Sequence, residues 1–198
     1  MYFDPTPKTL RSQKEMDEYL VRYDVRLPSN VKVEWCSSDT DYTEAPEAGC
    51  VCLHSQVLAL GLKFPLTDFV CDLLRYYHMA PSQLVVGGCH VVLSFQALCK
   101  RFVPDASWVE DFFALILIRR TKEGRCFFTA RSSFDKLIIN LANSDNGWRD
   151  TVIRIYGNWE TVLKKDCGAV PTAWNKGTLM HKEIPVTAKV EESVRSLL

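Results

Sequence analysis

The sequence predicts an α+β fold, in which three to four core helices form a compact, helix-rich domain with a small, mainly antiparallel sheet. Segments with apolar residues at helical spacing are interspersed with short segments in which apolar and polar residues alternate. A length of 198 residues suits one domain with extensions, or at most two small domains. With 47% hydrophobic and 24% charged residues, the composition is that of an ordinary folded protein.

The N-terminal part is predicted to hold one helix and one strand. The helix runs from Lys14 to Tyr23, because Ser12 and Glu15 have capping-box spacing ahead of an apolar stripe. Apolar and charged residues alternate over Val31–Trp35, which indicates a half-buried strand. The acidic and polar stretch Cys36–Gly49 is expected to be an exposed loop and the boundary of the main domain.

Two helices are predicted next, after a short apolar segment at Val51–Leu53. The first is brief, covers Ser55–Leu60 and ends near Gly61. The second has Pro65 in its first turn, where the missing N–H of proline costs nothing. Its apolar residues follow at helical spacing: Phe69, Leu73, Leu74 and Tyr77.

A long helix follows the break at Ala80-Pro81-Ser82 and runs through Val85–Phe102. It includes Gly87-Gly88, which costs a helix about 1 kcal/mol per glycine relative to alanine. We therefore expect close helix packing or a kink at this pair rather than a phosphate loop. Ser107 begins a further apolar segment, Trp108–Ile118, which starts with helical spacing.

The following region is predicted to be mainly β-structure. A turn at Glu123-Gly124 precedes a strand at Arg125–Arg131. The segment Leu137–Leu141 fits a helix or a strand equally well, and Asn143–Gly147 is a cluster of turn residues. Residues Thr151–Tyr156 are rich in residues that favour strands.

We divide the chain into three regions. Residues 1–30 form an N-terminal tail and helix, with a loose tail over residues 1–8. Residues 31–160 form the main domain. Residues 161–198 form an irregular, partly disordered extension, in which Val190–Leu198 is expected to be a short helix.

Charge and cysteine usage favour an intracellular protein, in the cytoplasm or nucleus. The 24 basic and 24 acidic residues cancel, so the chain exerts little long-range attraction on a nucleic acid. The N-terminus lacks the pattern of a secretory signal, and the longest apolar run, Phe112–Ile118, is too short to cross a membrane. The eight cysteines are scattered among apolar segments, which indicates free buried thiols in a reducing compartment.

The segment Cys50-Val-Cys-Leu-His54 is the best metal-like cluster, since alternate residues of a strand share a face. A structural zinc site needs four ligands, usually in two pairs, and the only other neighbours, Cys89-His90, would point apart on a helix. We therefore expect buried thiols beside a surface histidine, with no metal and no cofactor. No small-molecule substrate is evident either.

No catalytic residue is assigned. Cys71 and His78 share a helix face but stand about 10 Å apart by helical rise, beyond hydrogen-bond reach. Glu110-Asp111 lies near a helix start, where acidic side chains favour the macrodipole. Motifs of phosphate-binding loops, dinucleotide-binding folds, zinc proteases and serine hydrolases are missing from the sequence.

One basic patch beside aromatic residues is the candidate nucleic-acid site. Base stacking on its rings together with phosphate contacts is one interpretation, and a solvated turn between two core segments is the favoured one. The candidate residues are Arg119, Arg120, Lys122, Arg125, Phe127 and Phe128.

A series of motifs in the centre of the chain resembles the N-terminal domain of plant "putative gypsy-type transposon" (transposase-like) proteins. The resemblance covers roughly residues 30–160, and it rests on the order and spacing of the motifs. They are Gly49-Cys-Val-Cys-Leu53, Ala59-Leu-Gly-Leu-Lys-Phe-Pro-Leu66, Ala80-Pro-Ser-Gln-Leu84, Leu98-Cys-Lys100 and Gly147-Trp-Arg-Asp150. The stretch Val85-Val-Gly-Gly-Cys-His90 departs from the polar pattern usual at that place.

The resemblance implies a gag-like or transposon-derived module without protease, polymerase or zinc-knuckle motifs. Our leading hypothesis is a non-enzymatic interaction or assembly domain that binds a protein partner or another copy of itself. The second hypothesis is a nucleic-acid-binding module that uses the basic patch. The third is an enzyme with an unrecognised site.

Overall fold

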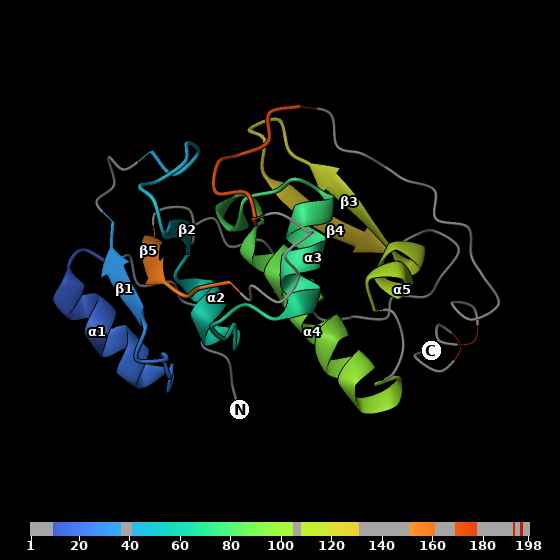
Figure 1. Cartoon of the computed structure of the whole chain (residues 1–198), viewed down its shortest axis with the longest axis horizontal. Coiled ribbons are helices and arrows are strands. Elements are labelled where there is room, and N and C mark those ends of the chain that lie inside the picture. The colour runs from blue at the N-terminus through green and yellow to red at the C-terminus, as the bar shows by residue number, and fades with distance from the viewer. Residues whose placement is uncertain are drawn as a thin grey trace.

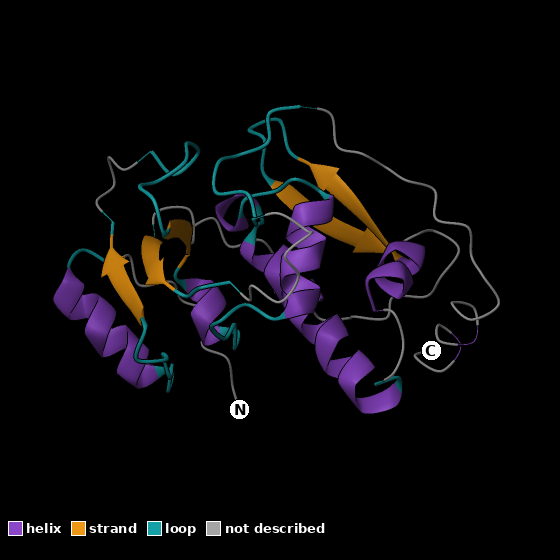
Figure 2. Ribbon diagram, in the orientation of Figure 1, coloured by secondary structure: helices purple, strands orange, loops and turns teal. Residues whose placement is uncertain are grey.

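The computed structural model describes residues 10–36, 41–104, 108–130, 151–160 and 169–177, together with residues 192 and 195. Over these ranges the chain forms five α-helices, a 3-10 turn and two small antiparallel sheets, which confirms the predicted α+β fold (Figures 1 and 2). In chain order the elements are α1 (Gln13–Arg22), β1 (Val31–Trp35), β2 (Cys50–His54), α2 (Gln56–Ala59), α3 (Asp68–Tyr76), η1 (Pro81–Gln83), α4 (Val86–Phe102), α5 (Trp108–Leu115), β3 (Ile116–Arg120), β4 (Cys126–Ala130) and β5 (Val152–Gly157).

The first sheet has the strand order β1-β5-β2, so the last strand in the sequence lies in the centre. Both neighbours run antiparallel to β5, with Val33 and Val51 opposite Ile155. Because side chains alternate across a strand, these residues share the face that packs into the core, whereas Lys32 and Arg154 lie on the other face. The predicted strands at residues 31–35 and 151–156 are thus confirmed.

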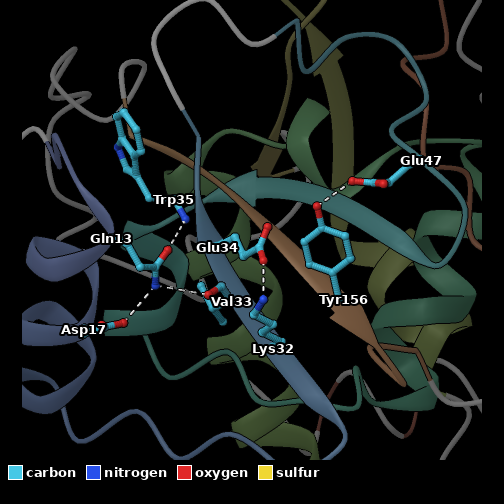
Figure 3. Close-up of polar contacts among 8 residues, drawn as sticks. All are labelled: Gln13, Asp17, Lys32, Val33, Glu34, Trp35, Glu47 and Tyr156. Carbon is cyan, nitrogen blue, oxygen red and sulfur yellow. Dashed lines mark hydrogen bonds and ion pairs between the residues drawn. The ribbon is translucent and has the colours of Figure 1, made fainter.

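Helix α1 covers the free edge of β1. Its start is capped as predicted, because the Ser12 hydroxyl accepts a hydrogen bond from the Glu15 N–H. The Gln13 side chain then reaches the strand: its Nε2 donates to the carbonyl of Val33 at 3.3 Å, and its Oε1 accepts from the N–H of Trp35 at 2.8 Å (Figure 3). This amide takes the place of a peptide group in a further strand and protects the edge from pairing with another chain.

The second sheet is the hairpin of β3 and β4, which packs against α4. Aromatic rings join this hairpin to the helices: Phe112 of α5 contacts Phe95 of α4 and Phe128 of β4, with ring centroids 5.2 and 5.0 Å apart. One hydrophobic core, which includes these rings, also extends to the inner face of the three-stranded sheet. Figure 1 shows that sheet with α1 toward one end of the long axis, and α5 with the hairpin toward the other.

The two glycines of α4 have different surroundings. A Cβ added at Gly88 would lie 2.6 Å from Cδ1 of Leu84 and 3.6 Å from Cα of Phe127 in β4, whereas one at Gly87 would meet nothing within 4 Å. The close packing that we predicted for the pair is therefore confirmed at Gly88 alone.

One prediction of local structure needs correction. Pro65 does not lie in a helical turn, because the N–H of Leu66 bonds to the carbonyl of Trp159 and α3 begins only at Asp68. The apolar run from Trp108 starts as a helix, as predicted, and changes to a strand at Ile116, where β-branched residues pair with β4.

Several predictions fall outside the described residues. They are the loose tail at residues 1–8, the ambiguous segment 137–141, the turn at 143–147 and most of the extension after residue 160. The motif at residues 147–150 also lies outside the described residues.

Replacing Gln13 by alanine should lower the free energy of unfolding by about 1–2 kcal/mol, because two backbone groups of β1 lose their partner. Asp17→Ala is the matched control: it removes only the exposed contact of Gln13 Nε2 with Asp17, and we expect a change below about 0.5 kcal/mol. Urea unfolding followed by circular dichroism measures both. Equal effects of the two variants would contradict the edge-protecting role of Gln13.

The two glycines of α4 should respond oppositely to alanine. Gly87→Ala should be neutral or stabilising by up to about 1 kcal/mol, as expected for helix propensity in open space. Gly88→Ala should be less stable than Gly87→Ala by about 1–3 kcal/mol, because the added methyl group forces Leu84 to move. Thermal unfolding of the pair tests this, and equal stabilities would show that the packing at Gly88 is loose.

Candidate functional site

The motif Ala80-Pro-Ser-Gln-Leu84 forms a buried turn between α3 and α4. Ala80 is extended and Pro81 opens the 3-10 turn, which suits its fixed φ and missing N–H. The chain then joins the hairpin, since the N–H of Val85 donates to the carbonyl of Cys126 at 2.9 Å. Ser82 and Gln83 are 1% and 0% exposed, so their polar groups must find partners inside the protein.

Gln83 finds these partners in two distant segments. Its Nε2 donates to the carbonyl of Gly124 in the β3–β4 turn and to the carbonyl of Asn175, both at 2.9 Å. Its Oε1 accepts from the N–H of Asn175 at 3.0 Å. The side-chain amide thus pairs with both backbone groups of one residue, as a neighbouring strand would.

Trp174 is held beside this pair. Its indole N–H donates to Oγ of Ser82 at 2.9 Å, and its ring meets the Tyr42 ring edge to face at 5.7 Å. The ring also lies over Gly124, where an added Cβ would be 3.6 Å from it. On the other side Tyr42 meets the ring of His54, and the Ser82 hydroxyl donates to the Tyr42 carbonyl at 3.2 Å.

The next residues are fixed by further polar contacts. The Asn175 amide donates to the carbonyl of Tyr77 at 3.4 Å, and Lys176 pairs with Glu44 at 2.8 Å. Arg120 donates to the carbonyl of Gly177. We call residues 174–177 the strap. The η1 site consists of Ser82, Gln83 and the residues around them that hold the strap. The orange-red strap lies beside the hairpin in Figure 1.

A buried anchor precedes the strap. Val170 is 2% exposed and belongs to the main core, and its N–H donates to the carboxylate of Glu160 at 3.0 Å. The same carboxylate pairs with Arg75 of α3 at 3.3 Å. Residues 169–177 contain no helix or strand, in keeping with the irregular structure predicted for this region.

The metal-like cluster on β2 is built differently from our expectation. His54 is 1% exposed, so the prediction of a surface histidine is wrong: η1 covers this end of β2, and Nε2 of His54 lies 3.2 Å from the Ser82 carbonyl. The thiols of Cys50 and Cys52 are buried, as predicted. In the part of the chain that the structure describes, no three metal-ligating side chains come close enough to hold an ion.

Burial keeps most thiols protonated. It raises the pKa of Cys50 to about 11 and that of Cys99 to about 12. Cys36 is different: its pKa is lowered, mainly by a hydrogen bond from the Cys52 thiol, with Arg154 also contributing. The same bond raises the pKa of Cys52.

The other side chains that we considered for chemistry lie in or next to helices α3 and α5. Cys71 is fully buried with its Sγ 3.6 Å from the Leu66 carbonyl, whereas His78 is exposed in the turn after α3. Glu110 and Asp111 lie in the first turn of α5, as predicted from the helix dipole.

The six candidate nucleic-acid residues lie on the β3–β4 hairpin and face different surroundings. Arg119 and Lys122 are exposed. Arg120 is bonded to the strap, and Arg125 donates to the Tyr42 hydroxyl at 3.1 Å. The two rings differ as well: Phe128 is 6% exposed in the core, and Phe127 is half-buried opposite Arg119.

The sequence singled out the Ala80–Leu84 motif but assigned no role to it. Two signals could have identified the site: a glutamine followed by leucine within a proline turn, and the isolated Trp174-Asn-Lys-Gly177 in an otherwise polar region. An aromatic residue in a weakly apolar extension packs on something, and a buried glutamine needs partners. Neither signal says that the two segments meet.

The raised thiol pKa values predict a loss of stability at alkaline pH. Below about pH 8.5 the thiols are protonated in both states, and above it the unfolded chain loses protons that Cys50 and Cys99 keep when folded. The free energy of unfolding should therefore fall as pH rises toward about 11, by at most about 1.4 kcal/mol per pH unit for each thiol. Urea unfolding of wild type and of Cys50→Ala/Cys99→Ala at about pH 7 and about pH 10.5 measures this. If the free energy of unfolding falls equally between the two pH values in both proteins, this prediction is wrong.

Comparison with known proteins gives one family. Within the described ranges, no helix is both long and apolar enough to cross a membrane. No curated protein and no solved structure matches the chain. Residues 51–120 match the model of a family described as putative gypsy type transposon. The match confirms the resemblance to gypsy-type transposon proteins that we inferred from the motifs, over a segment that extends from β2 to the end of β3.

Proposed function

We propose that this chain is a non-enzymatic protein-interaction domain, derived from a gypsy-like transposable element, that holds an extended peptide segment at the η1 site. The observation that carries the proposal is the pairing of the buried Gln83 amide with both backbone groups of Asn175. Backbone pairing of this kind gives affinity for an extended segment, and neighbouring side-chain pockets give specificity.

The contacts of the strap are of these two kinds: backbone pairing, which gives affinity, and side-chain contacts, which give specificity. The bonds of Gln83 reach only backbone atoms, so they accept any extended residue at this position. Trp174 supplies the selective contacts, through its bond to Ser82 and its packing on Tyr42 and Gly124. Hydrogen bonds of this type contribute about 0.5–1.5 kcal/mol each, and the indole adds the burial of a large ring.

The reactive side chains support a non-enzymatic role because they serve the packing. His54 lies against Ser82 beneath η1, and Cys71 lies in the core near the carbonyl of Leu66. The raised pKa of Cys50 and Cys99 keeps these thiols in the form that is a poor nucleophile.

The proposed origin and compartment are supported by the order of the motifs and by the buried thiols. The order of the central motifs supports derivation from a plant element, with a gag-like position in it. Six of the seven cysteines in the described residues are buried, which supports the cytoplasm or nucleus as the compartment.

Nucleic-acid binding is the second candidate, and the contacts of the hairpin favour it less. Arg120 and Arg125 already bond to the strap and to Tyr42, which leaves Arg119 and Lys122 as the exposed cations of the patch. Because the affinity for nucleic acid grows with the number of phosphate contacts, two cations give a weak, strongly salt-dependent interaction.

Peptide binding tests the proposal. A fluorescent peptide with the sequence of residues 169–177 is titrated with the full chain carrying Trp174→Ala and Asn175→Ala, so that the chain's own strap competes less. We expect a rise in anisotropy with a dissociation constant on the order of 10–100 μM. Wild type should bind more weakly.

Two controls test whether the peptide binds at the η1 site. Gln83→Ala added to the same chain should weaken binding about tenfold or more, because the backbone of the peptide loses its partner. A peptide with alanine in place of its tryptophan should also bind more weakly. Constant anisotropy up to about 1 mM folded protein would exclude the η1 site as a peptide-binding site.

A further inference from the structure

We propose that the partner at the η1 site is a second copy of this chain, and that two copies pair face to face and exchange their straps. The inference rests on the proposed function, because it names the occupant of the same site. Three features support this inference. They are the short segment that tethers the strap, the charges beside the strap, and the fact that the strap can make the same contacts with its own copy and with the other.

Residues 171–173, which we call the tether, connect two anchors. Val170 is buried in the core at one end, and Trp174 is bonded to Ser82 at the other. Residues 171–173 make no hydrogen bond within the described part of the chain, and Pro171 has no N–H to offer. The strap can therefore leave the η1 site while Val170 stays in place.

The length of the tether limits where the strap can go. Val170 and Trp174 are four residues apart in the sequence, so an extended chain separates them by at most about 14 Å. A released strap thus reaches only an η1 site that directly faces its own. This requirement selects a two-fold arrangement, in which the same surface of both copies forms the interface.

The surface around the strap is complementary to itself in charge. On one side lies the acidic loop, residues 41–47, with Asp41, Glu44, Glu47 and no basic residue. On the other lies the basic hairpin, residues 119–125, with four basic residues and one acidic residue. The two are neighbours, because Arg125 bonds to Tyr42. A two-fold axis through the strap places the acidic loop of each copy against the basic hairpin of the other.

Exchange keeps the contacts of the strap. The bonds that Trp174 and Asn175 make in one copy re-form with the same partners in the other, which are Ser82, Gln83, Thr43 and Tyr77. The balance between one copy and two is then set by protein concentration and by the charge contacts between loop and hairpin. High salt, which screens those contacts, should shift the balance toward single copies.

The first test reverses the charge of exposed residues beside the strap. Glu44→Lys changes the net charge of both loops of a homodimer from −3 to −1, and Lys122→Glu changes that of both hairpins from +3 to +1. Each variant alone should dimerise about tenfold or more weakly than wild type, measured by sedimentation velocity at low salt. A one-to-one mixture should recover dimers, because each altered loop then faces an altered hairpin.

This test does not depend on a buried position. The Glu44–Lys176 pair that the first variant breaks is 63% and 74% exposed in its two side chains, so its loss should leave the fold intact. Circular dichroism checks this. A wild type that remains a single copy at low salt over about a hundredfold range of concentration would overturn the proposal, and so would a mixture that behaves like its components.

Complementation of the strap is the second test. One full chain carries Gln83→Ala, which damages the acceptor and keeps the strap; the other carries Trp174→Ala and Asn175→Ala, which damage the strap and keep the acceptor. We expect each alone to be a single copy and the mixture to form a one-to-one complex. A mixture of folded variants without a complex would exclude exchange.

The outcomes separate this inference from the proposed function. If the labelled peptide binds but no pairing is seen, the η1 site is an interaction site for another protein and the inference of a second copy is wrong. If neither is seen, both are wrong. Salt-dependent binding of a short DNA duplex that is lost in Lys122→Glu, without pairing of copies, would favour the nucleic-acid alternative.

Discussion

A buried side-chain amide must find hydrogen-bond partners, and this constraint at Gln83 brings together parts of the chain that are far apart in the sequence. The turn after α3, the tip of the β3–β4 hairpin and the segment at Asn175 all meet there. If one of these parts were missing, the amide would lose a partner inside the protein, at a cost of about 1–3 kcal/mol. The site is therefore a property of the whole domain rather than of one motif.

Local structure was predictable where one periodic pattern is consistent over a whole element. The capping residues Ser12 and Glu15 and the alternation over Val31–Trp35 identified α1 and β1. Pairing was not predictable, because alternation gives the face of a strand but not its neighbour. His54 shows the consequence: a histidine at the end of an apolar run looks exposed until η1 is seen to cover it.

The candidate site was predicted only in part. Composition identified the basic hairpin, but it could not show that Arg120 and Arg125 are used within the chain or that Phe128 supports the core. Nor could it show that Trp174 binds Ser82, a contact between residues 92 positions apart. Contacts of that range depend on the path of the chain between their partners, and no local pattern encodes that path.

The central place of β5 has a consequence for synthesis on the ribosome. Strands β1 and β2 flank β5, so neither can complete its ladder until Val152–Gly157 has been made. At typical elongation rates, the interval between the end of β2 and the arrival of β5 is about 5–20 seconds. During that time the apolar residues of both strands lack their shared neighbour, and the nascent chain offers binding sites to chaperones. The covering of the β1 edge by Gln13, which lies earlier in the chain than the strand, is available throughout this wait.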